Sequence, residues 1–166
     1  MKILPILTCI GIAVWATGCS STSASKGEQD EAVPMSQVPP AVLQTLKGYA
    51  SESDVKTVGK GDQDGTVVYE FDLEQGSRKF ELTVRPDGKF MGTEEEIALA
   101  AMPQGAQTAL QDAAKGGKAI EYEKAVDENQ KTTYEAVIDK GGKKTEVAVD
   151  AAGKVISTEA VTPGKD

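Results

Sequence analysis

The sequence predicts an α+β fold of two tandem α-β-β-β-β units, each a helix packed on a four-stranded antiparallel meander. Three observations support this prediction: an internal repeat, a proline before each helical segment, and apolar–polar alternation between turns. Self-similarity at a fixed period indicates a duplicated structural unit. The repeat appears at a shift of 65 residues, where identical residues recur: Gly76 and Gly141, Lys79 and Lys144, Glu81 and Glu146, Val84 and Val149.

The amino end has the pattern of a secretory signal. Lys2 precedes an apolar run over residues 3–16 that is too short to span a bilayer as a helix. The segment Ala16-Thr17-Gly18-Cys19 resembles the lipobox of bacterial lipoproteins. That resemblance implies a signal peptide over residues 1–18 and diacylglycerol attachment at Cys19, which would hold the chain to the membrane. An ordinary signal peptide or a plain membrane anchor is the alternative.

A polar segment follows the expected lipid site. Residues 20–37 are rich in Ser, Thr, Lys, Glu, Gln and Asp and have no apolar periodicity. Such composition is typical of flexible linkers. We therefore expect residues 19–37 to be a flexible tether. Ser20 after the cysteine resembles the outer-membrane sorting pattern, which implies the periplasmic face of the outer membrane.

Each unit is expected to begin with a helix. The first unit covers residues 38–96 and the second 97–166, with a short disordered tail at the carboxyl end. Proline is tolerated in the first helical turn, and prolines precede the expected helices at residues 41–50 and 104–115. The acidic run before Ile97 is expected at the start of a short connecting helix over residues 94–101, where the helix dipole favours negative charge.

Four strands are expected after each helix. In the first unit they cover residues 55–59, 66–74, 78–85 and 89–92, and in the second 119–126, 132–139, 143–149 and 154–158. Tyr69, Phe71 and Leu73 alternate with Glu70 and Asp72, which predicts one apolar and one polar sheet face. Glycine and Asx residues between the segments provide the backbone conformations of tight turns.

The polar face of the sheet is the candidate binding surface. Its residues are charged or hydroxyl-bearing and alternate with the apolar set: Glu70, Asp72, Lys79, Glu81, Thr83, Arg85, Glu135, Asp139, Lys144 and Glu146. The glutamates could form a catalytic carboxylate pair, as in glycosidases. Cross-strand pairing with nearby lysines is the simpler interpretation.

Composition excludes several kinds of chemistry. The chain has no histidine, and its two cysteines, Cys9 and Cys19, both lie near the amino end. Catalysis by Ser-His-Asp or Cys-His is therefore excluded, and zinc loses its usual ligands. The net charge of −8 disfavours nucleic-acid binding. Asp62-Gln63-Asp64-Gly65 does not fit a calcium loop, because Lys60 and Phe71 fall where ligands belong. We expect no cofactor and no metal.

The repeat resembles the PepSY-like, or β-lactamase-inhibitor-like, family. The residues that carry the resemblance are the helix opening at Val38–Val42, Tyr69-Glu70 and the turn Asp87–Lys89, with counterparts at Met102-Pro103, Tyr134-Glu135 and Gly153-Lys154. The family implies exported tandem α+β units that bind or inhibit other proteins, without agreed catalytic residues. We therefore expect a non-enzymatic, lipid-anchored module that docks an unknown envelope or secreted protein. A structural lipoprotein, an Asp/Glu-dependent hydrolase and a weak cation binder are the alternatives.

Overall fold

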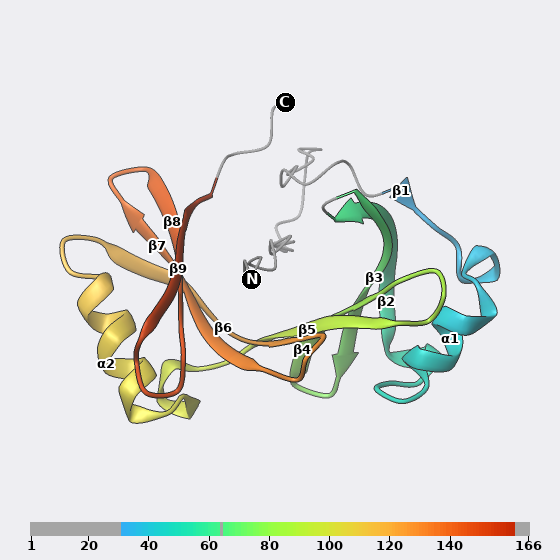
Figure 1. Ribbon diagram of the computed structural model, residues 1–166, viewed down its shortest axis with the longest axis horizontal. Coiled ribbons are helices and arrows are strands. Elements are labelled where there is room, and N and C mark those ends of the chain that lie inside the picture. Colours follow the sequence, from blue (N-terminus) through green and yellow to red (C-terminus); the bar gives the residue numbers. More distant parts are fainter. Residues whose placement is uncertain (1–30, 64, 162–166) are drawn as a thin grey trace.

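The computed structural model describes residues 31–63 and 65–161, which form a single nine-stranded antiparallel sheet with two short α-helices (Figure 1). The strands lie in the sheet in their chain order, from β1 to β9. They are β1 Glu31–Ala32, β2 Val55–Gln63, β3 Thr66–Gln75, β4 Arg78–Val84, β5 Phe90–Glu96, β6 Lys118–Asp127, β7 Thr132–Lys140, β8 Lys143–Val149 and β9 Val155–Ala160.

The predicted fold class is therefore wrong. The chain is mostly β, and its strands do not form two tandem helix-on-four-strand units. β5 and β6 pair with each other from Gly92–Asp127 to Glu96–Glu123, so the hydrogen-bond ladder runs through the middle of the chain without a break. Pairing of these two strands satisfies backbone groups that two separate sheets would leave unpaired at their edges.

A proline marks the start of both helices, as expected. α1 covers Pro40–Leu46, so Pro40 is its first residue, and α2 covers Gln104–Ala113, which Pro103 directly precedes. The side chains of Val42 and Leu46 in α1 are fully buried, and those of Ala106 and Leu110 in α2 are fully buried as well. Both helices are shorter at the carboxyl end than predicted, and 3-10 turns cover Met35–Gln37, Glu52–Asp54 and Leu99–Ala101.

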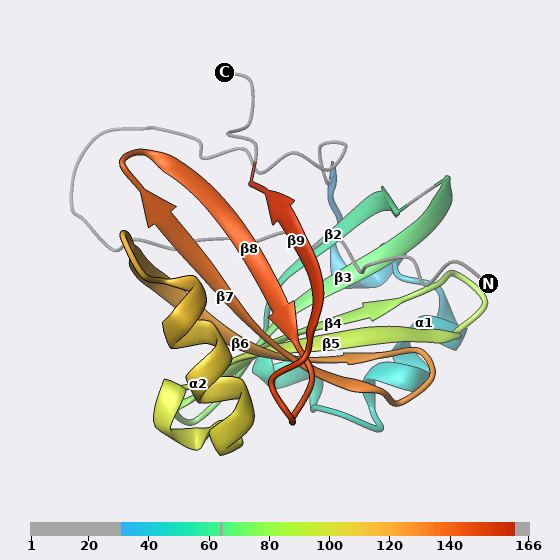
Figure 2. The same cartoon turned by 60° about the vertical axis from the view of Figure 1, so that its left-hand side comes forward.

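Each helix covers one end of the same sheet face. α1 packs over Phe71 and Leu82 in one apolar cluster, and α2 packs over Ile138 and Val149 in another. The strand pairing carries this face from β3 to β8, with register shifts at Thr83/Val84 and at Ala119/Glu121. The sheet is strongly bent, and the helices lie on the outer side of its two ends (Figures 1 and 2). The opposite face, here called the open face, lines the inside of the bend.

The end of the predicted tether belongs to the folded body. Glu31–Ala32 pairs with β2 as β1, and the Val33 N–H donates to the Val58 carbonyl oxygen at 2.9 Å. Val33 and Met35 also pack against the first apolar cluster. Residues 31–37 are thus held by the sheet and are not a flexible linker. The predicted signal peptide, Cys19, the rest of the tether and the tail after Val161 lie outside the described residues.

The acidic run Glu94-Glu95-Glu96 is in a strand and not at the start of a helix. β5 extends through Glu96, and only Leu99–Ala101 forms a short 3-10 turn afterwards. Pairing with β4 on one side and β6 on the other imposes the extended conformation. No helix in residues 31–63 or 65–161 is long and apolar enough to cross a membrane.

Candidate functional site

The predicted binding face corresponds to the open face of the sheet. Strand alternation places nine of its ten predicted residues there: Glu70, Asp72, Lys79, Glu81, Thr83, Glu135, Asp139, Lys144 and Glu146. The tenth, Arg85, follows the end of β4 and forms an exposed ion pair with Asp87. Because β5 and β6 are paired, residues from both halves of the chain lie on one surface.

Carboxylates gather at the centre of this surface. We call the set the glutamate row: Glu81, Glu94, Glu96, Glu121, Glu123, Glu135, Glu146 and Glu159. Five of its members, Glu94, Glu96, Glu121, Glu123 and Glu159, were missed from sequence. Alternation on β6 and β9 places Glu121, Glu123 and Glu159 on the polar side of their strands, whereas the acidic run of β5 has no such pattern. The β5–β6 pairing joins the two parts of the row.

Like charges lie directly opposite one another along the row. The paired positions are Glu81 with Glu94, Glu96 with Glu123, Glu123 with Glu135, and Glu146 with Glu159. None of Glu70, Glu81, Glu135 and Glu146 lies directly opposite a lysine. The expected pairing of these glutamates with nearby lysines therefore does not run between directly opposed residues. Like charges directly opposite each other in a sheet are destabilising.

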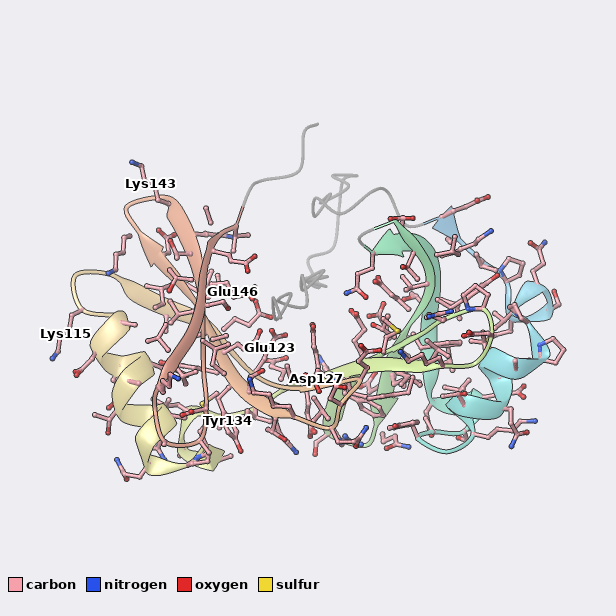
Figure 3. All side chains as sticks on the ribbon, viewed as in Figure 1. Lys115, Glu123, Asp127, Tyr134, Lys143 and Glu146 are labelled. Atoms are coloured by element: carbon pink, nitrogen blue, oxygen red, sulfur yellow. The ribbon has the colours of Figure 1, made fainter. Side chains whose placement is uncertain are left out.

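The central side chains of the row are partly removed from solvent. Glu135 is only 7% exposed, and its Oε1 accepts a hydrogen bond of 2.9 Å from the Thr133 hydroxyl. Ala125, Val137 and Ala148, which lie on the same face, are buried as well. Figure 3 shows Glu123 and Glu146 on the inner side of the bend, with Lys115 and Lys143 pointing outward. Curvature of the sheet thus places acidic side chains in a partly dehydrated setting.

The pKa values of the central carboxyls respond to this setting. Burial raises the pKa of Glu123 to about 8, and the charges of Glu121, Glu135 and Glu96 add to the effect. Burial also raises the pKa of Glu146 to about 8, with further contributions from the charges of Glu135 and Glu123 and from a hydrogen bond to Glu135. Both groups therefore retain protons at neutral pH.

Two further carboxyls of the row follow the same trend. Burial raises the pKa of Glu94 well above its usual range, and the nearby charges of Glu81, Glu123, Glu135 and Glu146 raise it more. Burial and the charge of Glu96 raise the pKa of Glu121, although the Lys144 ammonium opposes the shift. A cation brought to this face would gain from the negative potential and would displace the retained protons.

The other positions considered in the sequence have structural roles. Tyr69 is buried in the first apolar cluster, and Tyr134 packs against the second. The Gly65 N–H donates to the Asp62 carboxylate at 2.5 Å, with Gly65 at a φ of 79°, as in a hairpin turn. In the described part of the chain, no group of His, Cys, Asp and Glu side chains could hold a metal ion.

No family model and no curated protein matches the sequence. Solved structures do resemble it. A BLIP-like protein from Bacteroides fragilis aligns with a TM-score of 0.60 at 20% identity, over 77% of this chain and 90% of that protein. A predicted periplasmic protein from Bacteroides eggerthii aligns with a TM-score of 0.60 at 14% identity, over 75% and 90%. A DUF2874 family protein from Bacteroides ovatus gives 0.60 at 14% identity, over 74% and 88%. The chain therefore shares the BLIP-like fold.

Proposed function

We propose that this chain is a lipid-anchored binding module of the bacterial envelope, which docks a basic region of another protein on its open face. The observation that carries the proposal is the glutamate row, an acidic surface that extends across β4 to β9. A protein partner with lysine or arginine at its contact surface would complement this charge. The fold shared with a BLIP-like protein supports an inhibitor-like mode of binding.

The proposed location is on the periplasmic side of the outer membrane. The lipobox-like segment ending at Cys19 and Ser20 after it support this, as does the fold shared with a predicted periplasmic protein. Two or three acyl chains give stable anchoring where one does not. A clickable fatty acid should label the chain in cells, and Cys19→Ala should abolish the label. Labelling of the variant would contradict lipidation at this residue.

The binding proposal is tested by crosslinking in intact cells, followed by mass spectrometry. The variant Glu81→Lys/Glu146→Lys should lose most of the crosslinked partner, because its charge would repel a basic surface. Glu52→Lys is the matched control, since Glu52 is exposed on the 3-10 turn before β2 and outside the row. Equal capture by both variants would refute the open face as the docking surface.

One observation favours a second candidate, an Asp/Glu-dependent hydrolase. Carboxyls with raised pKa values, such as Glu123 and Glu146, can act as general acids. Sequence reasoning placed Glu146 on this face and considered a carboxylate pair there, but it did not include Glu123. Purified full chain would be assayed against glycoside and ester substrates, with Glu123→Gln as the control. Turnover that this substitution abolishes would favour the hydrolase over the binding module.

A further inference from the structure

The last strand of the sheet, β9, has one side that pairs with no strand among residues 31–63 and 65–161. It covers Val155–Ala160 and pairs only with β8 on its other side. The opposite edge of the sheet ends in β1, which is just Glu31–Ala32. The two edges therefore differ, and β9 presents the longer run of backbone donors and acceptors.

The register identifies which backbone groups of β9 point away from β8. The Val161 N–H donates to the Lys144 carbonyl oxygen at 3.0 Å, which fixes the phase of the antiparallel ladder. Hydrogen-bonded and non-hydrogen-bonded pairs alternate in such a ladder. Glu159 and Ser157 therefore bond to β8, whereas the N–H and C=O groups of Thr158 and Ala160 face outward.

This edge lacks most of the devices that prevent strand addition. Natural edges carry lysine, proline or bulges, but Val155–Ala160 contains neither lysine nor proline. Its register irregularity lies at the start of the strand, next to Val155. Val155 itself is 53% exposed. The backbone from Ser157 onward is therefore regular enough to pair with another strand.

Charge decides which strand would fit. Glu159 is the only charged side chain of β9, it lies on the open face, and it is directly opposite Glu146. A second copy pairing through its own β9 would bring another acidic edge to this one, and the chain has a net charge of −8. Like charges across strands are destabilising, and opposite charges are stabilising. A basic strand is therefore favoured over a copy of this chain.

On the basis of the function proposed above, we propose that the partner is recognised by strand addition at β9. Its docking segment is extended and carries lysine or arginine at alternate positions. The main chain of the segment pairs with Thr158 and Ala160, and its basic side chains lie on the open face beside Glu159 and the end of the glutamate row. Main-chain bonds give affinity in this mode, and alternate side chains give specificity.

The test measures amide hydrogen exchange in the full chain, with and without a synthetic peptide in which lysine alternates with threonine. In the free chain the amides of Thr158 and Ala160 should exchange quickly, and those of Ser157 and Glu159 slowly. The peptide should slow exchange at Thr158 and Ala160 by tenfold or more. Slow exchange at these two amides without peptide would show that the chain already covers the edge, and would overturn the proposal.

A second peptide separates strand addition from simple charge attraction. It has the same sequence, but the amides that would face β9 are N-methylated, so its charge is kept and its pairing is blocked. We expect at least tenfold weaker binding. Equal binding of the two peptides would overturn strand addition and leave the acidic docking face intact. Binding of neither peptide would count against both proposals.

A variant of the protein blocks the same pairing from the side of β9. Thr158→Pro removes an N–H that points away from β8, so the β8–β9 ladder keeps its bonds, and the ring obstructs an incoming strand. This variant should keep the melting temperature within a few degrees and lose binding of the unmethylated peptide. Full binding by a folded Thr158→Pro chain would also overturn the proposal.

Discussion

Glu123 on β6 lies directly opposite Glu135 on β7, on the face of the sheet that no helix covers. Glu135 is 7% exposed and accepts a hydrogen bond from Thr133, while burial raises the pKa of Glu123 to about 8. Opposed carboxyls in a partly dehydrated setting cannot both ionise without a cost in stability. The fold keeps this arrangement beside the β5–β6 pairing that joins its two halves, where Glu123 also lies opposite Glu96.

Neutralising Glu123 should stabilise the protein at high pH. Glu123→Gln keeps the shape of the side chain and removes its charge beside Glu135 and Glu96. At pH 9 we expect the melting temperature to rise by roughly 3–6 °C, which corresponds to about 1 kcal/mol in a domain of this size. Differential scanning calorimetry would measure it. Glu52→Gln, on the exposed 3-10 turn, is the control and should change little. A lower melting temperature for Glu123→Gln would contradict the repulsion.

The stability of the wild-type chain should fall as pH rises from about 5 to about 9. In the unfolded chain these glutamates titrate near 4.5, whereas the folded pKa values of Glu123 and Glu146 are about 8. The folded state therefore binds more protons between these values, so the free energy of unfolding decreases across this window. The stabilising contribution is fully present below the unfolded pKa and is lost once pH passes about 8.

Melting curves at constant ionic strength from pH 4.5 to 9.5 would measure this trend. Added salt should raise the melting temperature at pH 9 more than at pH 5, because screening weakens repulsion between ionised carboxylates. Asp54 has the opposite dependence on pH. Hydrogen bonds from Ser51 lower its pKa, so its contribution to stability is lost only at pH values below this window. A melting temperature that rises steadily from pH 5 to pH 9 would contradict the raised pKa values.

Gly88 should tolerate a side chain less well than Gly76. Both adopt positive φ angles, 85° and 64°, but a Cβ at Gly88 would lie 2.8 Å from the Ala41 carbonyl oxygen, and a Cβ at Gly76 would meet nothing within 4 Å. The Gly88 carbonyl also accepts a hydrogen bond of 2.6 Å from Thr45, which ties the β4–β5 turn to α1.

We expect Gly76→Ala to cost about 1 kcal/mol, from the backbone angle alone. Gly88→Ala should cost roughly 2–4 kcal/mol, because the angle and the close contact act together. Urea denaturation of both variants would measure the difference. Equal costs would show that α1 can move away from the turn without loss.

Features set by local sequence could be predicted well. The expected strands at 66–74 and 143–149 correspond to β3 and β8, because alternation and glycine-containing turns act within a few residues. Proline likewise marks the start of α1 and α2. The open face was anticipated for the same reason, since the side of a strand on which a residue lies follows from alternation alone.

Features set by distant partners could not be predicted. Glu94-Glu95-Glu96 has no apolar alternation, and β4 and β6 impose its strand. Glu31–Ala32 is polar by composition, yet it pairs with Lys60 and Gly59. The β5–β6 ladder joins residues about 30 positions apart, and no local signal marks it. This pairing turned the expected two units into one sheet and assembled the glutamate row.

Binding of a basic partner should release protons at neutral pH. At pH 7 the carboxyls of Glu123 and Glu146 retain their protons, because their pKa values are about 8. A cation beside them favours the ionised form, so binding lowers these pKa values and expels protons. Affinity should therefore increase from pH 5 to about 8 and then level off.

Calorimetric titration at pH 7, with the alternating lysine peptide as the probe, would count these protons. The apparent binding enthalpy should differ between phosphate and Tris in proportion to the protons released, since the two buffers differ in ionisation enthalpy. Glu123→Gln/Glu146→Gln should remove most of that difference. The double substitution should weaken binding more at pH 9 than at pH 5, because the wild-type carboxyls are already neutral at pH 5 and ionised at pH 9. Identical enthalpies in the two buffers for the wild-type chain would show that the peptide binds away from the centre of the row.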